Sequence, residues 1–313
     1  MNASNPKPTT IFLMGPTAAG KTGLAMRIAD TLPVGLISVD SGQVYRGMDI
    51  GTAKITAKEM MDYPHALIDI REPSEPYSAD EFRTDALQLM NDFQAQGRVP
   101  LLVGGTMFYF RALQYGLPDL PAADEAVRGK LLLEAKEDGW QALHDRLSEI
   151  DPESAVRINP NDRQRIQRAL EIYQLSGVTP TQHVRNSMQE IPWKIIKIGI
   201  WPSVRTLLHE NIEKRLSQMF EQGFLDEVRV LQAQGLENSL PAMRTVGYRQ
   251  VLEHLDGKSS DEEMRLRCLY STRQLAKRQL TWLRNDPGLK WFDSKDEDYP
   301  KKVLEFIRKK TSV

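Results

Sequence analysis

The sequence has little of what would mark a disulfide-linked, metal-rich or membrane-spanning protein. Its 313 residues include one cysteine, Cys268, which excludes an internal disulfide and a cysteine-rich zinc site and predicts a small buried side chain. No stretch approaches the roughly 18 consecutive apolar residues of a membrane helix, and residues 1–8 lack the apolar core of a signal peptide. The five histidines are scattered, and no internal repeat is present. We therefore expect a cytoplasmic protein with no membrane partner.

A large net charge is also lacking, because 41 Lys and Arg residues nearly balance 42 Asp and Glu residues, which leaves a formal net charge of -1. This balance excludes a molecule that is drawn as a whole to nucleic acid, so any such role requires local basic patches. Apolar residues at 41% and charged residues at 27% are ordinary for a globular protein. A chain of this length can form one large or two modest domains.

The first motif that is present is a phosphate-binding loop. Residues 15–22 match the pattern G-x-x-x-x-G-K-[ST], after an apolar run at 10–14 that predicts a strand and before apolar residues at helical spacing. Backbone N–H groups of such a loop bind an anion at a helix N-terminus, where Lys21 would hold the terminal phosphate and Thr22 a divalent cation. The loop comprises Gly15, Pro16, Thr17, Ala18, Ala19, Gly20, Lys21 and Thr22. It predicts a bound phosphate chain but not its fate.

Two further predicted strands end in polar residues. The strand at 36–39 leads into Asp40, and in an open α/β sheet it would present Asp40 on the same side as the phosphate loop. An Asp at a strand end can equally serve as a cap for the next turn, and the sequence leaves both interpretations open. The strand at 99–103 ends in Gly104, Gly105 and Thr106, where an ordinary P-loop ATPase would carry an Asp. A tight turn with a Thr cap is the alternative there.

The remainder of the chain predicts an α/β protein, with a P-loop NTPase-like parallel sheet flanked by helices and an all-helical insertion. We assign residues 1–114 and 187–313 to the core and 115–186 to the insertion. A predicted helix at 162–175 has an apolar face and a basic, amide-rich face, which is either a solvated surface or a phosphate contact. Arg215 follows the resumed strand at 194–200 and is either a surface charge or a phosphate ligand. The loop at 244–250 and the basic helix at 272–284 suit RNA bases and phosphates, although the helix could merely aid solubility.

Together the segments 15–22, 37–45, 47–54, 102–106, 246–248 and 273–279 resemble the bacterial tRNA dimethylallyltransferase family, over about residues 11–282. The resemblance implies transfer of a dimethylallyl group from dimethylallyl diphosphate to the N6 amine of the adenosine 3′ of the anticodon, with release of pyrophosphate. It implies Mg²⁺ as cofactor, bound at Thr22, and the tRNA anticodon stem-loop as partner. We expect a monomer.

The resemblance also implies roles for individual residues. Asp40 would accept the amine proton, Thr106 would orient the amine or the diphosphate, and Lys21 and Arg215 would stabilise the leaving group. The implied tRNA contacts are Asp40, Ser41, Gly42, Gln43, Thr106, Arg128, Gln164, Arg165, Ile166, Gln167, Arg168, Arg244, Thr245, Val246, Gly247, Tyr248 and Arg249. Two other functions compete: a small-molecule kinase, which the missing Asp after Val103 disfavours, and a non-enzymatic RNA-binding NTPase, which gives Asp40 and Thr106 no role.

Overall fold

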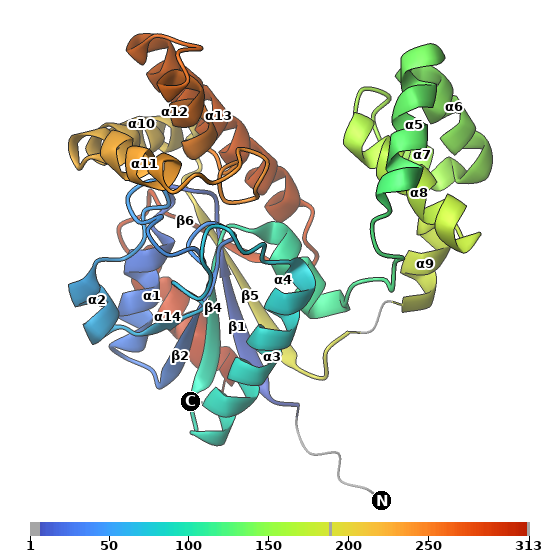
Figure 1. Ribbon diagram of the computed structural model, residues 1–313. Coiled ribbons are helices and arrows are strands. Elements are labelled where there is room, and N and C mark those ends of the chain that lie inside the picture. Colours follow the sequence, from blue (N-terminus) through green and yellow to red (C-terminus); the bar gives the residue numbers. More distant parts are fainter. Residues whose placement is uncertain (1–6, 188–189, 312–313) are drawn as a thin grey trace, which may run out of the picture. The chain divides into compact units, whose positions relative to one another are not determined.

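The structure is a computed structural model that describes residues 7–187 and 190–311. Most of the polar N-terminal stretch at 1–8 therefore lies outside the described residues. The chain forms two compact units, one of Met1–Leu113 with Pro192–Val313 and one of Gln114–Ile191 (Figure 1). The second unit extends past the expected limit at 186, and the Ile191 N–H donates to the Gln114 carbonyl at 3.1 Å, which joins the two ends of the unit.

The larger unit is built on a six-stranded parallel sheet in the order β3-β2-β4-β1-β5-β6. The strands are β1 (Thr9–Met14), β2 (Val34–Val39), β3 (His65–Ala66), β4 (Val99–Gly104), β5 (Lys194–Trp201) and β6 (Lys290–Asp293). The four central strands are the four predicted from buried apolar runs, as both faces of a parallel sheet are covered. The prediction of an α/β fold with a parallel sheet is confirmed.

Helices cover both faces of this sheet (Figure 1). On one face α1 (Lys21–Ala29) and α14 (Tyr299–Thr311) bury Leu24, Ile28, Val303 and Ile307 against the strands. The other face carries α3 (Ala79–Ala95), which begins after a capping box formed by Ser78 and Glu81, and α4 (Met107–Tyr115). The strands are thereby fixed in a three-layer core, with their carboxyl ends leading into the phosphate loop, Asp40 and Thr106.

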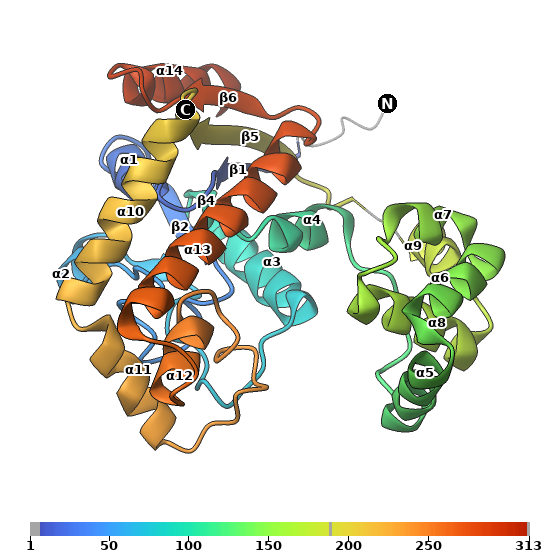
Figure 2. The same cartoon turned by 90° about the horizontal axis from the view of Figure 1, so that it is seen from above.

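Four further helices lie beyond the carboxyl ends of the strands (Figures 1 and 2). They are α10 (Arg205–Glu221), α11 (Phe224–Ala233), α12 (Tyr248–Leu255) and α13 (Asp261–Arg284). A separate short helix, α2 (Ala57–Asp62), precedes β3. Cys268 is fully buried in α13, as its isolation in the sequence predicts. These helices supply side chains that reach back to the loops at the sheet's edge.

The smaller unit is all-helical, as predicted. It comprises α5 (Glu125–Glu137), α6 (Gly139–Ile150), α7 (Pro152–Arg157), α8 (Arg163–Ser176) and α9 (Pro180–Ser187). Its core of Leu131, Leu143, Leu147, Ile166 and Leu170 is separate from that of the larger unit. Within residues 7–187 and 190–311, no helix is both long and apolar enough to cross a membrane.

Candidate active site

The phosphate loop joins β1 to α1. Gly20 adopts a left-handed conformation with φ of 85° directly before α1, and within residues 7–187 and 190–311 no side chain caps that helix. The amides of its first turn are therefore left for an anion. Lys21 Nζ donates to the Pro16 carbonyl at 2.8 Å, which folds the lysine back over the loop. A Cβ at Gly15 would lie 2.5 Å from the Ile200 carbonyl of β5, so only glycine lets the loop leave the sheet here.

Three charged groups, Lys21, Arg215 and Asp40, lie within electrostatic range of one another beside this loop. Burial and the neighbouring Arg215 guanidinium lower the pKa of Lys21 to about 7, while Asp40 acts in the opposite direction. Burial likewise lowers the pKa of Arg215, again against the effect of Asp40. Arg215 Nη2 also donates to the Thr52 carbonyl at 3.3 Å. Of the two interpretations of Arg215, the structure thus supports the one that brings it to the phosphate loop.

Asp40 and Thr106 meet where β2 and β4 end side by side. Asp40 Oδ1 accepts from the backbone N–H of Gly42 at 2.9 Å and of Gln43 at 3.3 Å. Thr106 Oγ1 accepts from the Ser41 N–H at 3.1 Å. Asp40 is therefore a turn cap and also a member of the charged cluster, because Oδ1 alone holds the turn. Among the described residues, no hydrogen bond reaches Oδ2.

Gly104 and Gly105, which follow Val103, lack a Cβ where other atoms of the protein approach their backbone closely. A Cβ at Gly104 would lie 2.0 Å from the Val39 carbonyl, and one at Gly105 would lie 2.4 Å from Gln279 Nε2. Gln279 is on α13, and its Oε1 accepts from the Thr17 N–H of the phosphate loop at 2.9 Å. Gln279 lies in the segment 273–279, but no spacing in the sequence marks it as a member of the site.

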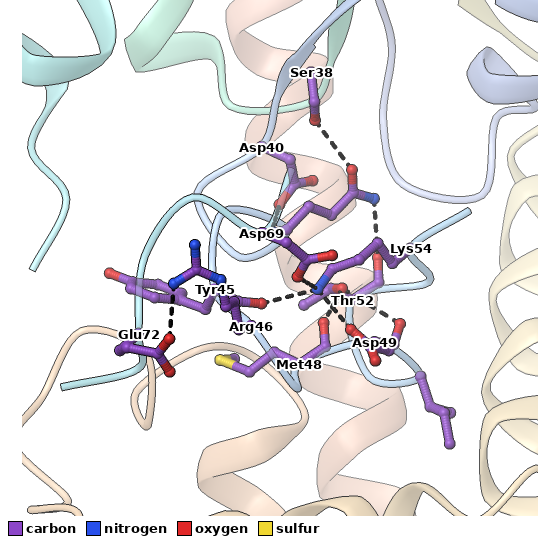
Figure 3. A network of polar contacts seen from close by, with 12 residues as sticks. Ser38, Asp40, Tyr45, Arg46, Met48, Asp49, Thr52, Lys54, Asp69 and Glu72 are labelled. Atoms are coloured by element: carbon purple, nitrogen blue, oxygen red, sulfur yellow. Dashed lines mark hydrogen bonds and ion pairs between the residues drawn. The ribbon is translucent and has the colours of Figure 1, made fainter. Parts of the chain in front are cut away.

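The loop at 47–54 forms the next wall of the site (Figure 3). Lys54 lies almost fully buried between Asp49 at 2.6 Å and Asp69 at 2.5 Å, and it also donates to the Tyr45 carbonyl. The Thr52 carbonyl accepts from Gln43 Nε2 at 3.3 Å as well as from Arg215. Ser38 Oγ donates to the other end of the Gln43 amide at 3.0 Å. Gln43 is thus held on both sides, so its side chain supports the site's frame.

Glu227 on α11 anchors this loop and was not predicted. Its carboxylate accepts from the N–H groups of Asp49 at 2.9 Å, Ile50 at 2.7 Å and Gly51 at 3.1 Å, and from the Tyr248 hydroxyl at 2.6 Å. Tyr248 is fully buried and packs edge-on against Phe224 at 5.1 Å. The prediction that Tyr248 contacts tRNA is therefore corrected, because its ring is in the core and its hydroxyl serves Glu227.

We expect Glu227→Gln to destabilise the larger unit. The amide presents an NH₂ group to donors that now share a carboxylate, and each buried donor left unpaired costs about 1–3 kcal/mol. Urea unfolding should give a free energy of unfolding lower by about 2 kcal/mol or more. Glu221→Gln, an exposed position on α10, is the matched control and should change nothing. Equal stability of the two variants would show that Glu227 is dispensable for the loop.

Three of the predicted tRNA contacts in the helical unit, Arg128, Gln167 and Arg168, form hydrogen bonds with other residues of that unit. Glu171, fully buried, accepts from Arg128 at 2.9 Å and Arg168 at 2.8 Å, and Gln167 donates to the Arg128 carbonyl. Burial raises the pKa of Glu171, but the bonds from Arg168, the Asp124 N–H and Arg128 outweigh it, so the pKa is lowered.

Ile166 belongs to the apolar core, so its predicted tRNA contact is corrected. Gln164 and Arg165 are exposed, and Arg165 forms an ion pair with Asp162 at 3.2 Å. They are the two side chains of this segment most accessible to a partner.

The predicted loop at 244–250 ends at Gly247, because residues from Tyr248 onward belong to α12, and its first part lies against the Asp40 turn. A Cβ at Gly42 would come within 3.5 Å of the Thr245 methyl group, so two predicted tRNA segments are neighbours. Arg244 and Arg249 are exposed, Val246 is half-buried and Gly247 is buried with φ of 96°. The two arginines therefore remain candidates for contact with a polyanion, while Gly247 supports the backbone.

Hard oxygen donors for a cation are few. Thr22 is exposed in the first turn of α1, next to Lys21. Over the described ranges, no group of three or more His, Cys, Asp or Glu side chains is arranged to hold a metal ion. A cation here would need oxygens from a bound diphosphate and water to complete its shell, an arrangement that suits Mg²⁺.

Known proteins share both the sequence and the fold of this chain. The sequence profile of the IPP transferase family matches residues 43–286. A tRNA isopentenylpyrophosphate transferase from Bacillus halodurans is 40% identical, with 98% of this chain and 97% of that chain covered and a TM-score of 0.73.

A tRNA delta(2)-isopentenylpyrophosphate transferase from Staphylococcus epidermidis is 35% identical, with coverage of 98% and 99% and a TM-score of 0.70. A eukaryotic dimethylallyltransferase acting on tRNA is 24% identical over 97% of this chain and 79% of that chain; its TM-score of 0.76 supports the fold alone. The profile and the two bacterial enzymes agree over most of the chain, and this protein belongs to the IPP transferase family.

Proposed function

We propose that this protein transfers a dimethylallyl group from dimethylallyl diphosphate to the exocyclic N6 amine of the adenosine 3′ of the anticodon in tRNA, releasing pyrophosphate. Family membership supports prenyl transfer to tRNA. The observation that supports the donor is the convergence of Lys21, Arg215 and an uncapped helix N-terminus beside Asp40. A diphosphate fits this cationic end, and an amine fits the carboxylate beside it.

The reaction would proceed by displacement at the allylic carbon. The bond between C1 and the diphosphate oxygen breaks, the electron pair leaves with pyrophosphate, and the N6 nitrogen forms the new bond to C1. Lys21, Arg215 and the α1 amides would stabilise the growing charge on the leaving group. Asp40 would accept the N6 proton through Oδ2, since Oδ1 is already bonded to the Gly42 and Gln43 amides. Thr106, which holds the Ser41 amide, would orient the acceptor.

Mg²⁺ fits the same proposal as a partner of the diphosphate. Bound at Thr22, it would add positive charge where the pyrophosphate oxygens become more negative. The chain's own contribution is the hydroxyl, together with Lys21 and Arg215 as fixed cations. We further propose that the protein acts as a monomer in the cytoplasm.

A product assay tests the function directly. Protein, Mg²⁺, dimethylallyl diphosphate and unmodified tRNA are incubated, the tRNA is digested, and the nucleosides are analysed by mass. The expected result is a prenylated adenosine from the anticodon loop and one pyrophosphate per transfer. Consumption of ATP with unmodified tRNA would instead support the kinase or NTPase alternative and overturn the proposal.

The tRNA contact in the helical unit has its own test. Arg165→Glu should weaken tRNA binding and reduce the salt dependence of log K by about one, because one phosphate contact is lost. Dimethylallyl diphosphate affinity should not change. Lys136→Glu, an exposed position two turns along α5 from Arg128, makes the same charge change as a control. If both variants bind tRNA equally, Arg165 is not a contact and its charge acts only at long range.

A further inference from the structure

One side chain joins the two halves of the proposed site. Gln279 Oε1 accepts from the Thr17 N–H of the phosphate loop at 2.9 Å, and Gln279 Nε2 donates to the Gly105 carbonyl at 2.8 Å. Both partners fix the orientation of the amide, because a backbone N–H can only donate and a carbonyl can only accept. The two ends of one planar group thus hold two segments that lie 262 and 174 residues from it along the chain.

The two hydrogen bonds of Gln279, to Thr17 and to Gly105, are here called the Gln279 bridge, and this bridge is connected to the acceptor side of the site. Gly105 precedes Thr106, whose hydroxyl accepts from the Ser41 N–H at 3.1 Å, and Ser41 follows Asp40. A short hydrogen-bonded path therefore runs from the diphosphate loop through Gln279 to the proposed base. Nothing else among the described contacts gives Thr17 N–H and the Gly105 carbonyl a shared partner.

The surroundings are built around this amide. Gly105 carries no Cβ, and one added there would lie 2.4 Å from Gln279 Nε2. One turn of α13 away, Ala276 packs with Leu208 and Ile212 of α10, and Ala18 of the phosphate loop packs against the same cluster. The helix is thus seated on the loop, and Gln279 is half-buried in a fixed place.

The bridge also changes which amides remain for an anion. Thr17 N–H is committed to Gln279, and the Ala19 N–H bonds to the Pro16 carbonyl at 3.3 Å. The loop therefore offers a diphosphate its amides nearer Lys21, at the start of α1. This places the anion's contacts at one end of the loop and Gln279 at the other.

We propose that Gln279 is a positioning residue that sets the spacing between the diphosphate loop and the Thr106–Asp40 side of the site. This inference rests on the proposed function. Misplacement of reacting groups by about 1 Å can cost a factor of about 100 in rate, so the spacing is worth controlling. Loss of the bridge should slow the transfer step more than it weakens substrate binding.

Three variants test this role under single-turnover conditions. Gln279→Ala should reduce the rate of transfer about 10- to 100-fold, with the dissociation constant of dimethylallyl diphosphate changed far less. Gly105→Ala should have a similar effect by displacing the amide, and the double variant should be little worse than either single one. Gln94→Ala, at an exposed position on α3, is the matched control and should match the wild-type rate.

Gln279→Glu supplies a readout that a merely structural role would not give. An ionised carboxylate would repel the Gly105 carbonyl, whereas a protonated carboxyl can donate to it and still accept from Thr17, as the amide does. The rate relative to wild type should therefore rise as the pH falls, with thermal unfolding of both proteins monitored at each pH. A ratio that is flat with pH would overturn the proposal.

Amide hydrogen exchange separates failure of this inference from failure of the function. In Gln279→Ala the Thr17 N–H should exchange faster than in the wild type, whatever reaction the protein catalyses. If the wild type forms no prenylated adenosine but this exchange rises, the bridge stands and the assigned reaction is wrong. If the wild type is active and Gln279→Ala transfers at the same rate, the positioning role is wrong.

Discussion

Asp40→Asn should slow transfer by about 100- to 10,000-fold, the range that a positioned general base contributes, while diphosphate binding is retained. The amide oxygen can still accept from the Gly42 and Gln43 N–H groups, so the turn survives and only the carboxylate is lost. Single-turnover rates with saturating tRNA report the chemical step, and pyrophosphate titration reports the binding of the leaving group.

The pH and the controls decide what this variant means. Asp40 raises the pKa of Lys21, so its removal lowers that pKa further below about 7. Binding should therefore be compared over a pH series that extends well below 7, at the pH where affinity has stopped rising in both proteins and Lys21 is protonated in each. Asp62→Asn at an exposed position is the matched control. Asp40→Ala would remove the carboxylate and, in addition, the acceptor for the Gly42 and Gln43 N–H groups that form the turn. An equal loss of rate and pyrophosphate affinity in Asp40→Asn would assign Asp40 to the scaffold instead of to proton transfer.

The parts of the site that the sequence predicts are those set by strand order. Asp40 directly follows an apolar run, and because parallel strands end at one edge of the sheet, its position predicts that it lies on the same side as the phosphate loop. Thr106 also follows an apolar run, but its orienting role is implied by the family resemblance. β6 was missed because it is a four-residue edge strand that begins with two exposed residues, so its pattern is not that of a buried strand.

Contacts made across the chain could not be predicted in this way. Glu227 binds amides 176 to 178 residues away, and Gln279 binds one 262 residues away, so no local spacing marks either residue. Ile166 and Tyr248 were misassigned for another reason. They lie inside segments that were treated as uniform contact surfaces, although helical periodicity already placed Ile166 on the apolar face.

Lys21→Met should reduce kcat/KM for dimethylallyl diphosphate about 100- to 1000-fold near pH 6.5, the cost of removing one preorganised donor from a developing anion. Most of this loss should fall on the transfer step, because the charge on the leaving group grows as the allylic bond breaks. Thr31→Ala, at an exposed position after α1, is a control that leaves the loop untouched.

The lowered pKa of Lys21 gives a second, independent measurement. The free protein protonates Lys21 below about pH 7 and loses that charge as the pH rises. A bound diphosphate favours the charged form and raises the pKa, so binding between pH 7 and pH 9 must take up a proton, and affinity must fall as pH rises. Calorimetry of pyrophosphate binding in buffers of different ionisation enthalpy counts the proton. The same titration of Lys21→Met gives the proton uptake that is due to the ligand's own ionisation. Subtracting it from the wild-type value leaves the contribution of Lys21. Equal proton uptake by both would show that Lys21 does not change its protonation state on binding, and the pH dependence would have to come from another group.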